Sequence, residues 1–250
     1  MPVVSLLRSV GNKAYQRSFP IYHVLYRAFK TYTDRAERHL LRTILFAGAV
    51  TVDAGANIGI YSQFLSRCVG STGVVHSFEP SHENFRRLQS ATRKLANVRV
   101  SRAAVGERTG KSTLYLSDRL NVDHRTYITK EGPRNAVPID IIALDDYFES
   151  GQQVDLIKMD IQGYELHALR GATRVLQENP NIHLLLEFWP SGLEQAGVHW
   201  EELIEMLRGF GMDVTVVRPS GLAPLDARDV QLDVSWYVNL FACRRRQARG

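Results

Sequence analysis

Short apolar runs alternate with stretches of helical periodicity along most of the chain. We interpret as buried strands the runs "AVTVDAG", "GVVHSFEP", "VRVSRAAVG", "VDLIKMD" and "IHLLLEFW", which helix-like segments separate. Strand–helix alternation implies right-handed crossovers, so it predicts a mainly parallel sheet with both faces covered. Two further runs, "MDVTVVRP" and "WYVNLFACR", have no clear helix between them and predict an antiparallel pair at the sheet edge. The expected fold class is α/β, a Rossmann-like, doubly wound, seven-stranded sheet.

The two ends of the chain differ from this alternating part. Apolar residues before the first strand recur at helical spacing, and the chain ends with "RRRQARG". We therefore predict an N-terminal helical extension over 1–48, a core domain over 49–243 and a basic tail over 244–250. The net charge of +5 is concentrated at the ends, with +6 over 1–43 and +4 in the tail, so the part between them carries −5. This distribution gives poor support to a basic groove for nucleic acid in the core.

The stretch "TVDAGANIG" places a glycine turn directly after the first strand of the core domain. Ligands of α/β sheets bind at the carboxyl ends of the strands. Gly55 would bring the backbone near a ligand, Gly59 would let the next helix pack close to the strand, and Asn57 tolerates the positive φ of such a turn. The carboxylate of Asp53 would repel a pyrophosphate but suits a ligand with an amino group. The loop therefore favours S-adenosylmethionine over a dinucleotide.

An acid ends the second strand of the core domain, twenty residues after Gly59. At this spacing, the carboxylate of Glu79 is placed to accept hydrogen bonds from both ribose hydroxyls of a nucleoside. The third strand ends in the small residues Ala103 and Ala104, which would leave room for a flat adenine ring. We expect the cofactor to contact Asp53, Gly55, Asn57, Ile58, Gly59, Glu79, Pro80, Ala104 and Asp160.

Five segments between about residues 50 and 190 resemble the FkbM-type methyltransferases: "VDAGANIGIYS", "SFEP", "LDDYF", "IKMDIQGYELHALRGA" and "LLLEF". The resemblance implies a class I, S-adenosylmethionine-dependent enzyme, and most members of the family are O-methyltransferases of sugars and secondary metabolites. The usual form of the fourth segment is Lys-Ile-Asp-Val-Glu-Gly-x-Glu. This chain keeps Lys158, Asp160, Gly163 and Glu165, but Gln162 replaces the first Glu and removes one carboxylate near the site.

Methyl transfer to a hydroxyl group needs a donor and an acceptor held in line, together with a base. Asp160 ends the fourth strand, and we expect it to orient or deprotonate the acceptor; a helix-capping role is the alternative. Lys158 lies on the same strand face and needs a charged partner, for which Asp160 or Glu187 would serve. We expect Glu187 to pair with Lys158 or to bind the substrate. Mg²⁺ held by Asp160 and Glu187 is an alternative that we do not favour.

The segment "LNVDHRTY" lies in a strand-like insertion between the third and fourth core strands. Similar Asn-x-x-Asp-His-Arg stretches occur in part of the FkbM family. His124 titrates near neutral pH and is a natural general base, so we predict a catalytic role for it, with an exposed turn as the alternative. The neighbouring polar residues are predicted to bind the substrate: Asn121, Asp123 and Arg125.

The partners of this protein follow less directly from the sequence. Core packing is the first expectation for the aromatic residues Tyr22, Tyr26, Phe29 and Tyr32; pocket cover, a membrane surface and a homodimer through the N-terminal helices are alternatives. Two cysteines, no apolar run of about 18 residues and no signal-peptide pattern favour a cytoplasmic protein. The leading function is O-methylation of a small molecule or glycan. A nucleic-acid methyltransferase and a non-catalytic cofactor-binding or scaffold protein remain open.

Overall fold

The computed structural model describes residues 19–116, 125–126, 135–233 and 235–244. The strands of the main sheet are β1 Val50–Ala54, β2 Val74–Phe78, β3 Val98–Ser101, β7 Leu156–Met159, β8 His183–Phe188, β9 Met212–Arg218, β10 Gly221–Pro224 and β11 Val238–Arg244. A smaller sheet contains β4 Ala104–Val105, β5 Gly110–Leu116 and β6 Asn135–Ile142. The helices are α2 Phe19–Thr33, α3 Arg35–Ile44, α4 Ile60–Val69, α5 His82–Thr92, α6 Leu144–Tyr147, α7 Glu165–Arg170, α8 Thr173–Glu178, α9 Pro190–Gln195 and α10 Trp200–Gly209.

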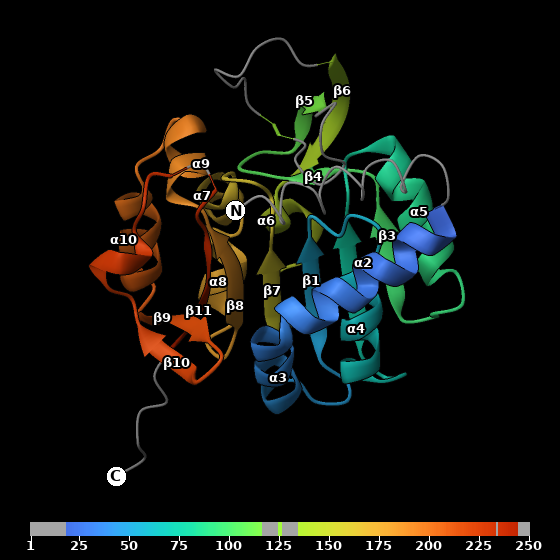
Figure 1. Cartoon of the computed structure of the whole chain (residues 1–250), viewed down its shortest axis with the longest axis horizontal. Coiled ribbons are helices and arrows are strands. Elements are labelled where there is room, and N and C mark those ends of the chain that lie inside the picture. The colour runs from blue at the N-terminus through green and yellow to red at the C-terminus, as the bar shows by residue number, and fades with distance from the viewer. Residues whose placement is uncertain (1–18, 117–124, 127–134, 234, 245–250) are drawn as a thin grey trace.

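The main sheet has the strand order β10-β9-β11-β8-β7-β1-β2-β3 (Figure 1). β1 is parallel to β2 and β7, β7 is parallel to β8, and β11 is antiparallel to both of its neighbours. The predicted α/β fold with an antiparallel edge is thus confirmed. The described sheet has eight strands and not seven, because β10 folds back onto β9. The sequence of β10, "GLAP", is short, mostly exposed and ends in proline, so it has no apolar run that would mark a strand.

The chain leaves the main sheet after β3 and forms the smaller sheet, drawn above the main one in Figure 1. Ala104 lies in β4, pairs with β6 and packs with Leu114, Ile139 and Ile141. This placement corrects the expectation that Ala104 ends the third strand. Its methyl group is buried in the core of the smaller sheet.

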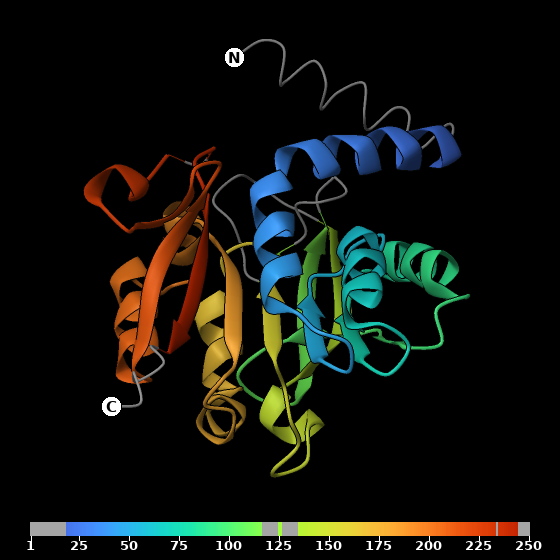
Figure 2. The ribbon, with the colours of Figure 1, turned by 90° about the horizontal axis from the view of Figure 1, so that it is seen from below.

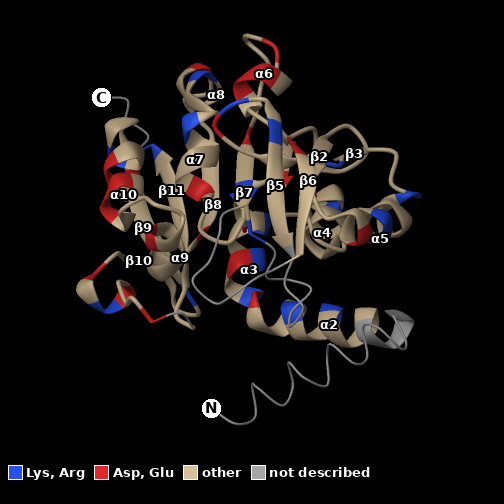
Figure 3. Ribbon diagram, turned by 90° about the horizontal axis from the view of Figure 1, so that it is seen from above, with Lys and Arg blue, Asp and Glu red and all other residues tan. Residues whose placement is uncertain are grey.

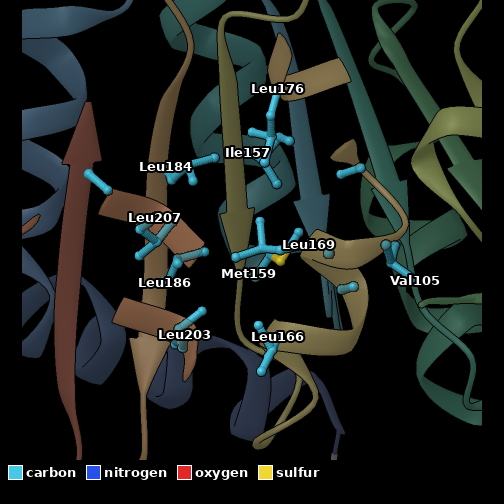
Figure 4. Close-up of a cluster of buried hydrophobic side chains, with 14 of the residues drawn as sticks. Val105, Ile157, Met159, Leu166, Leu169, Leu176, Leu184, Leu186, Leu203 and Leu207 are labelled. Carbon is cyan, nitrogen blue, oxygen red and sulfur yellow. The ribbon is translucent and has the colours of Figure 1, made fainter. Parts of the chain in front are cut away.

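Two apolar clusters cover the two faces of the main sheet. Ile157 and Leu184 belong to a cluster that also contains Leu207 of α10 (Figure 4), whereas Leu185 packs on the opposite face with Leu41 of α3. This split follows from the strand period of two, which points successive side chains to opposite faces. The helical extension therefore shares a core with the sheet.

α2 lies along the outside of α4 and the loop that precedes α4 (Figure 2). Tyr26 of α2 packs against Ile58 and Ile60. Phe29 and Tyr32 are 55% and 71% exposed, so the expected core packing is correct for Tyr26 and wrong for these two residues. Among the helices described, none combines the length and the apolar character needed to cross a membrane. Acidic and basic residues are mixed within single helices, such as α3, α5 and α10 (Figure 3).

The last strand includes Arg244, which the sequence placed in the basic tail. Its guanidinium donates hydrogen bonds to the carbonyl oxygens of Phe210, Asn179 and Leu176 at 2.7, 3.1 and 2.8 Å. Helix ends leave carbonyl groups without intrahelical partners, and a cation there is stabilising. Arg244 therefore caps the ends of α8 and α10 and belongs to the folded domain.

Candidate active site

The loop between β1 and α4 adopts a tight, left-handed conformation. Gly55, Asn57 and Gly59 have φ values of 76°, 49° and 86°, so Asn57 fills a position that most residues avoid. A Cβ atom on Gly55 would collide with the carbonyl oxygen of Asp160, and one on Gly59 would lie 3.0 Å from Leu88 of α5. Both glycines thus allow close packing inside the chain. The close neighbour of Gly59 is α5 and not β1, which corrects the expectation that this glycine packs a helix on the strand.

Glu79 follows β2 and holds the glycine loop in place. Its Oε2 accepts a hydrogen bond from the backbone N–H of Asn57, and its Oε1 accepts one from Ser81, both at 2.9 Å. Burial raises the pKa of Glu79 to about 7, against the opposing effect of these amides. The side chain of Asn84 also hydrogen-bonds this carboxylate, which leaves it acceptor capacity for a ribose hydroxyl of a nucleoside cofactor. Pro80 follows it and is half-buried.

Asp53 and Lys158 form a buried ion pair on adjacent strands, with Nζ 3.3 Å from Oδ1. The other oxygen of Asp53 accepts a hydrogen bond from Ser62 Oγ at 2.7 Å, and Ser62 in turn accepts one from Ser77 at 2.9 Å. Lys158 Nζ lies farther from Asp160, at 4.0 Å. Asp53 was expected to contact the cofactor, but its side chain is 0% exposed and engaged by other residues of the chain. Asp53 is thus the close partner of Lys158, a pairing that the sequence did not lead us to predict.

Gln162 joins two carboxyl groups at the ends of β7 and β8. Its Nε2 donates hydrogen bonds to Asp160 Oδ1 at 2.9 Å and to Glu187 Oε2 at 2.8 Å. Gln162 has a φ of 58°, and the turn around it is held by Glu165, which accepts a hydrogen bond from the N–H of Ile161 at 3.0 Å. The position where the chain departs from the usual family sequence therefore bridges the two acids predicted at neighbouring strand ends.

The surroundings of this bridge shift the pKa values of the two acids in opposite directions. Burial would raise the pKa of Asp160, but Lys158, Lys30 and hydrogen bonds outweigh it, so the pKa is lowered. Burial, followed by the charge of Asp160, raises the pKa of Glu187 well above its ordinary value. Burial would lower the pKa of Lys158, yet the carboxylates of Asp53 and Asp160 raise it. Asp160 is therefore the stronger acid of the two, and Lys158 keeps its charge at neutral pH.

A cavity of about 330 Å³ opens beside Asp160 and Glu187. Its walls come from the ends of β7, β8 and β9, the start of β11, and the junction of α2 and α3. The extension contributes Lys30, Asp34 and Glu37, and Lys30 Nζ lies 2.9 Å from Asp34 Oδ2. Sequence reasoning missed these three residues. Their spacing of four and three residues, which suits one helix face, was the available signal.

Two other predicted site residues, Ile58 and Arg125, lie apart from this cavity. Ile58 is 1% exposed and packs with Ile60. Arg125 is buried, lies 4.7 Å over the ring of Trp189 and donates a hydrogen bond to Gln195 at 2.8 Å, so it fastens the insertion to the segment after β8. Within the described ranges, no group of three His, Cys, Asp or Glu side chains is arranged to hold a metal ion. Three predicted residues lie outside the described part of the chain: Asn121, Asp123 and His124.

The reversed β11, the glycine loop after β1 and the acid at the tip of β2 define a class I methyltransferase fold with a nucleoside-cofactor site. Residues 53–213, more than half of the chain, match the family model of the Methyltransferase FkbM domain. The chain belongs to the FkbM family of methyltransferases, and its cofactor is S-adenosylmethionine.

Two curated proteins are similar to this chain. Hexuronic acid methyltransferase AglP of Haloferax volcanii is 30% identical over 57% of this chain and 59% of its own length. Methyltransferase 1 of Beauveria bassiana is 28% identical over 48% of this chain and 57% of its own length. The chain thus spans less than two thirds of either relative.

Solved structures support the fold at low sequence identity. An rRNA methylase from Streptococcus thermophilus has a TM-score of 0.50 and 10% identity, covering 84% of this chain and 95% of its own. SMU.1697c of Streptococcus mutans, in complex with SAH, has a TM-score of 0.50 and 10% identity, covering 82% and 94%. At this identity, the likeness shows the shared fold alone.

Proposed function

We propose that this chain is an O-methyltransferase that methylates a hydroxyl group of a sugar or a sugar-like small molecule. The observation that carries the proposal is the pair of acids at the ends of β7 and β8. Lys158 and Lys30 lower the pKa of Asp160 against the effect of burial, whereas burial and the charge of Asp160 raise the pKa of Glu187, and both side chains line the same cavity. An ionised carboxylate in this place suits the proton of an acceptor hydroxyl.

The cofactor would be held by the loop after β1 and by Glu79. The backbone of Gly55 and Asn57 follows the end of β1, and the Glu79 carboxylate faces the same loop. S-adenosylmethionine supplies an activated methyl group on a sulfonium when it is bound. The chain's own contribution is to hold the acceptor oxygen in line with that group and to exclude water.

Asp160 would take the hydroxyl proton as the acceptor oxygen forms its bond to the methyl group. Lys158 and Lys30 keep Asp160 ionised before this step, since both lower its pKa. Gln162 fixes the position of the carboxylate through the 2.9 Å hydrogen bond to its Oδ1. Lys158 is charged, so its part in catalysis is electrostatic and not that of a base.

Two further observations support a sugar as the acceptor. AglP, one of the curated relatives, is named a hexuronic acid methyltransferase. The cavity is lined by the carboxyl groups of Asp34, Glu37, Asp160 and Glu187 together with the ring of Tyr237, and sugars offer hydroxyl donors and apolar ring faces to such a surface.

The test measures methyl transfer from labelled S-adenosylmethionine to hexoses, hexuronic acids and other hydroxylated metabolites, with and without a chelator. We expect methyl transfer to a hydroxyl group, and we expect the chelator to leave the rate of this transfer unchanged. Asp160→Asn should lower turnover by roughly 10²–10⁴-fold while cofactor affinity stays near wild type, because the amide keeps the shape but cannot accept the proton. Near-normal turnover of this variant would refute the role of Asp160 as a base.

A further inference from the structure

We propose that Glu37 binds a second hydroxyl group of the acceptor, one that is not methylated. This inference rests on the proposed function and extends it to the recognition of the substrate. Glu37 lies in α3, in the helical extension, and lines the same cavity as Asp160 and Glu187.

The two oxygens of Glu37 have different surroundings. Oε1 accepts a hydrogen bond from Asn239 Nδ2 at 2.7 Å, which fixes the carboxylate. Oε2 is buried and has no hydrogen-bond partner among the residues that the structure describes. The whole residue is 7% exposed. A buried carboxylate oxygen without a donor is unfavourable, so this oxygen is suited to a donor that a ligand brings into the cavity.

Asn239 connects the carboxylate of Glu37 to the strand end that carries Glu187. It lies directly across from Glu187 in the antiparallel pair of β11 and β8. The register therefore places the group that holds Glu37 next to the strand end that carries Glu187. A molecule that presents one hydroxyl to Asp160 and another to Glu37 would span the cavity.

None of the described cations that line the cavity supplies a donor to Glu37 Oε2. Each of the three already has a carboxylate partner: Lys30 with Asp34 at 2.9 Å, Lys158 with Asp53 at 3.3 Å and Arg218 with Asp229 at 2.7 Å. A hydroxyl group brings the donor that Glu37 Oε2 needs without adding charge, so a polyhydroxylated acceptor fits the cavity.

Glu37 and Asn239 both lie outside the matched family domain, which covers residues 53–213. Glu37 precedes that range and Asn239 follows it. The region that carries Asp160, Gln162 and Glu187 supplies the chemistry, whereas the two flanking segments meet above it and select the acceptor. This arrangement gives the N-terminal extension a role in specificity.

The test measures binding and not turnover, so it is independent of the methylation assay. Methyl glycosides of hexoses and hexuronic acids, with their monodeoxy analogues, are titrated into the full chain saturated with S-adenosylhomocysteine. We expect Glu37→Gln to raise the dissociation constant of the best glycoside about tenfold, with unchanged cofactor affinity. One monodeoxy analogue should lose the same factor on wild type and nothing on the variant. Glu201→Gln, at an exposed acid in the first turn of α10, is the matched control and should bind like wild type.

Three outcomes overturn the inference. Equal affinity of wild type and Glu37→Gln for the glycosides would mean that Oε2 faces water and not a ligand. A loss that is the same for every monodeoxy analogue would indicate a general structural effect. Binding of cofactor but of no glycoside would reject a sugar acceptor, while methylation of another hydroxylated compound would still support the proposed function. If Glu37→Gln does not fold, Asn239→Ser removes the donor to Oε1 and should give the same loss of selectivity.

Discussion

Replacing Glu79 with Gln should change how the stability of this protein depends on pH. Glu79 is 5% exposed, and its pKa is raised to about 7 by burial, from an ordinary value of 4.5. The folded chain therefore holds a proton that the unfolded chain has released between these two pH values. Stability from this group is fully present below pH 4.5 and is lost as the pH rises through about 7. The shift corresponds to about 3 kcal/mol.

The Gln variant resembles the protonated acid in shape and charge, so it should lack this dependence. We expect the free energy of unfolding of cofactor-free Glu79→Gln, relative to wild type, to rise by about 3 kcal/mol between about pH 4.5 and pH 8. Urea denaturation at a series of pH values measures it. Glu165→Gln is a matched comparison, because Glu165 is also buried with a pKa raised to about 7 and should contribute a similar slope. A difference between Glu79→Gln and wild type that is constant across this range would refute the raised pKa.

The same substitution should weaken cofactor binding, although it should stabilise the fold relative to wild type at high pH. The ionised carboxylate of Glu79 is the form that accepts two ribose hydroxyls, so Glu79→Gln should weaken S-adenosylmethionine binding by about 1–3 kcal/mol at pH 8. Calorimetry measures this loss. A variant that is stabilised at high pH and also binds the cofactor like wild type would show that Glu79 serves only the loop.

Four further variants test other parts of the structure. Gly55→Ala should cost several kcal/mol of stability, because its Cβ would collide with the carbonyl of Asp160; a wild-type Tm would contradict this packing. Removing residues 245–250 should leave urea stability unchanged, whereas removing Arg244 as well should cost about 2–4 kcal/mol through three lost hydrogen bonds; equal stability of the two truncations would disprove the capping role. Phe29→Ser should convert a homodimer to a monomer at unchanged Tm in light scattering, since Phe29 is 55% exposed on α2; a monomeric wild type would reject pairing through this helix.

The mainly parallel sheet and its antiparallel edge could be predicted from the local pattern of the chain. Apolar runs that alternate with helical periodicity specify parallel strands with crossovers, because burial on both faces leaves a continuous apolar signal. The glycine loop and the acid Glu79 at the tip of β2 could also be predicted from the sequence, because residues close together in the chain form the turn and the strand tip. Asp160 and Glu187 were placed at one edge of the sheet because each ends a parallel strand.

The pairing of the polar groups in the site could not be predicted from the sequence. Asp53 was assigned to a ligand, yet the register of β1 and β7 sets it against Lys158. Gln162 looked like a lost acid, and the turn that carries it makes it a bridge between two carboxyl groups. Glu37 meets Asn239 across 202 positions of sequence. Periodicity reports which face of an element is buried, whereas the partner of a buried polar group depends on the register and packing of distant elements, which local pattern does not encode.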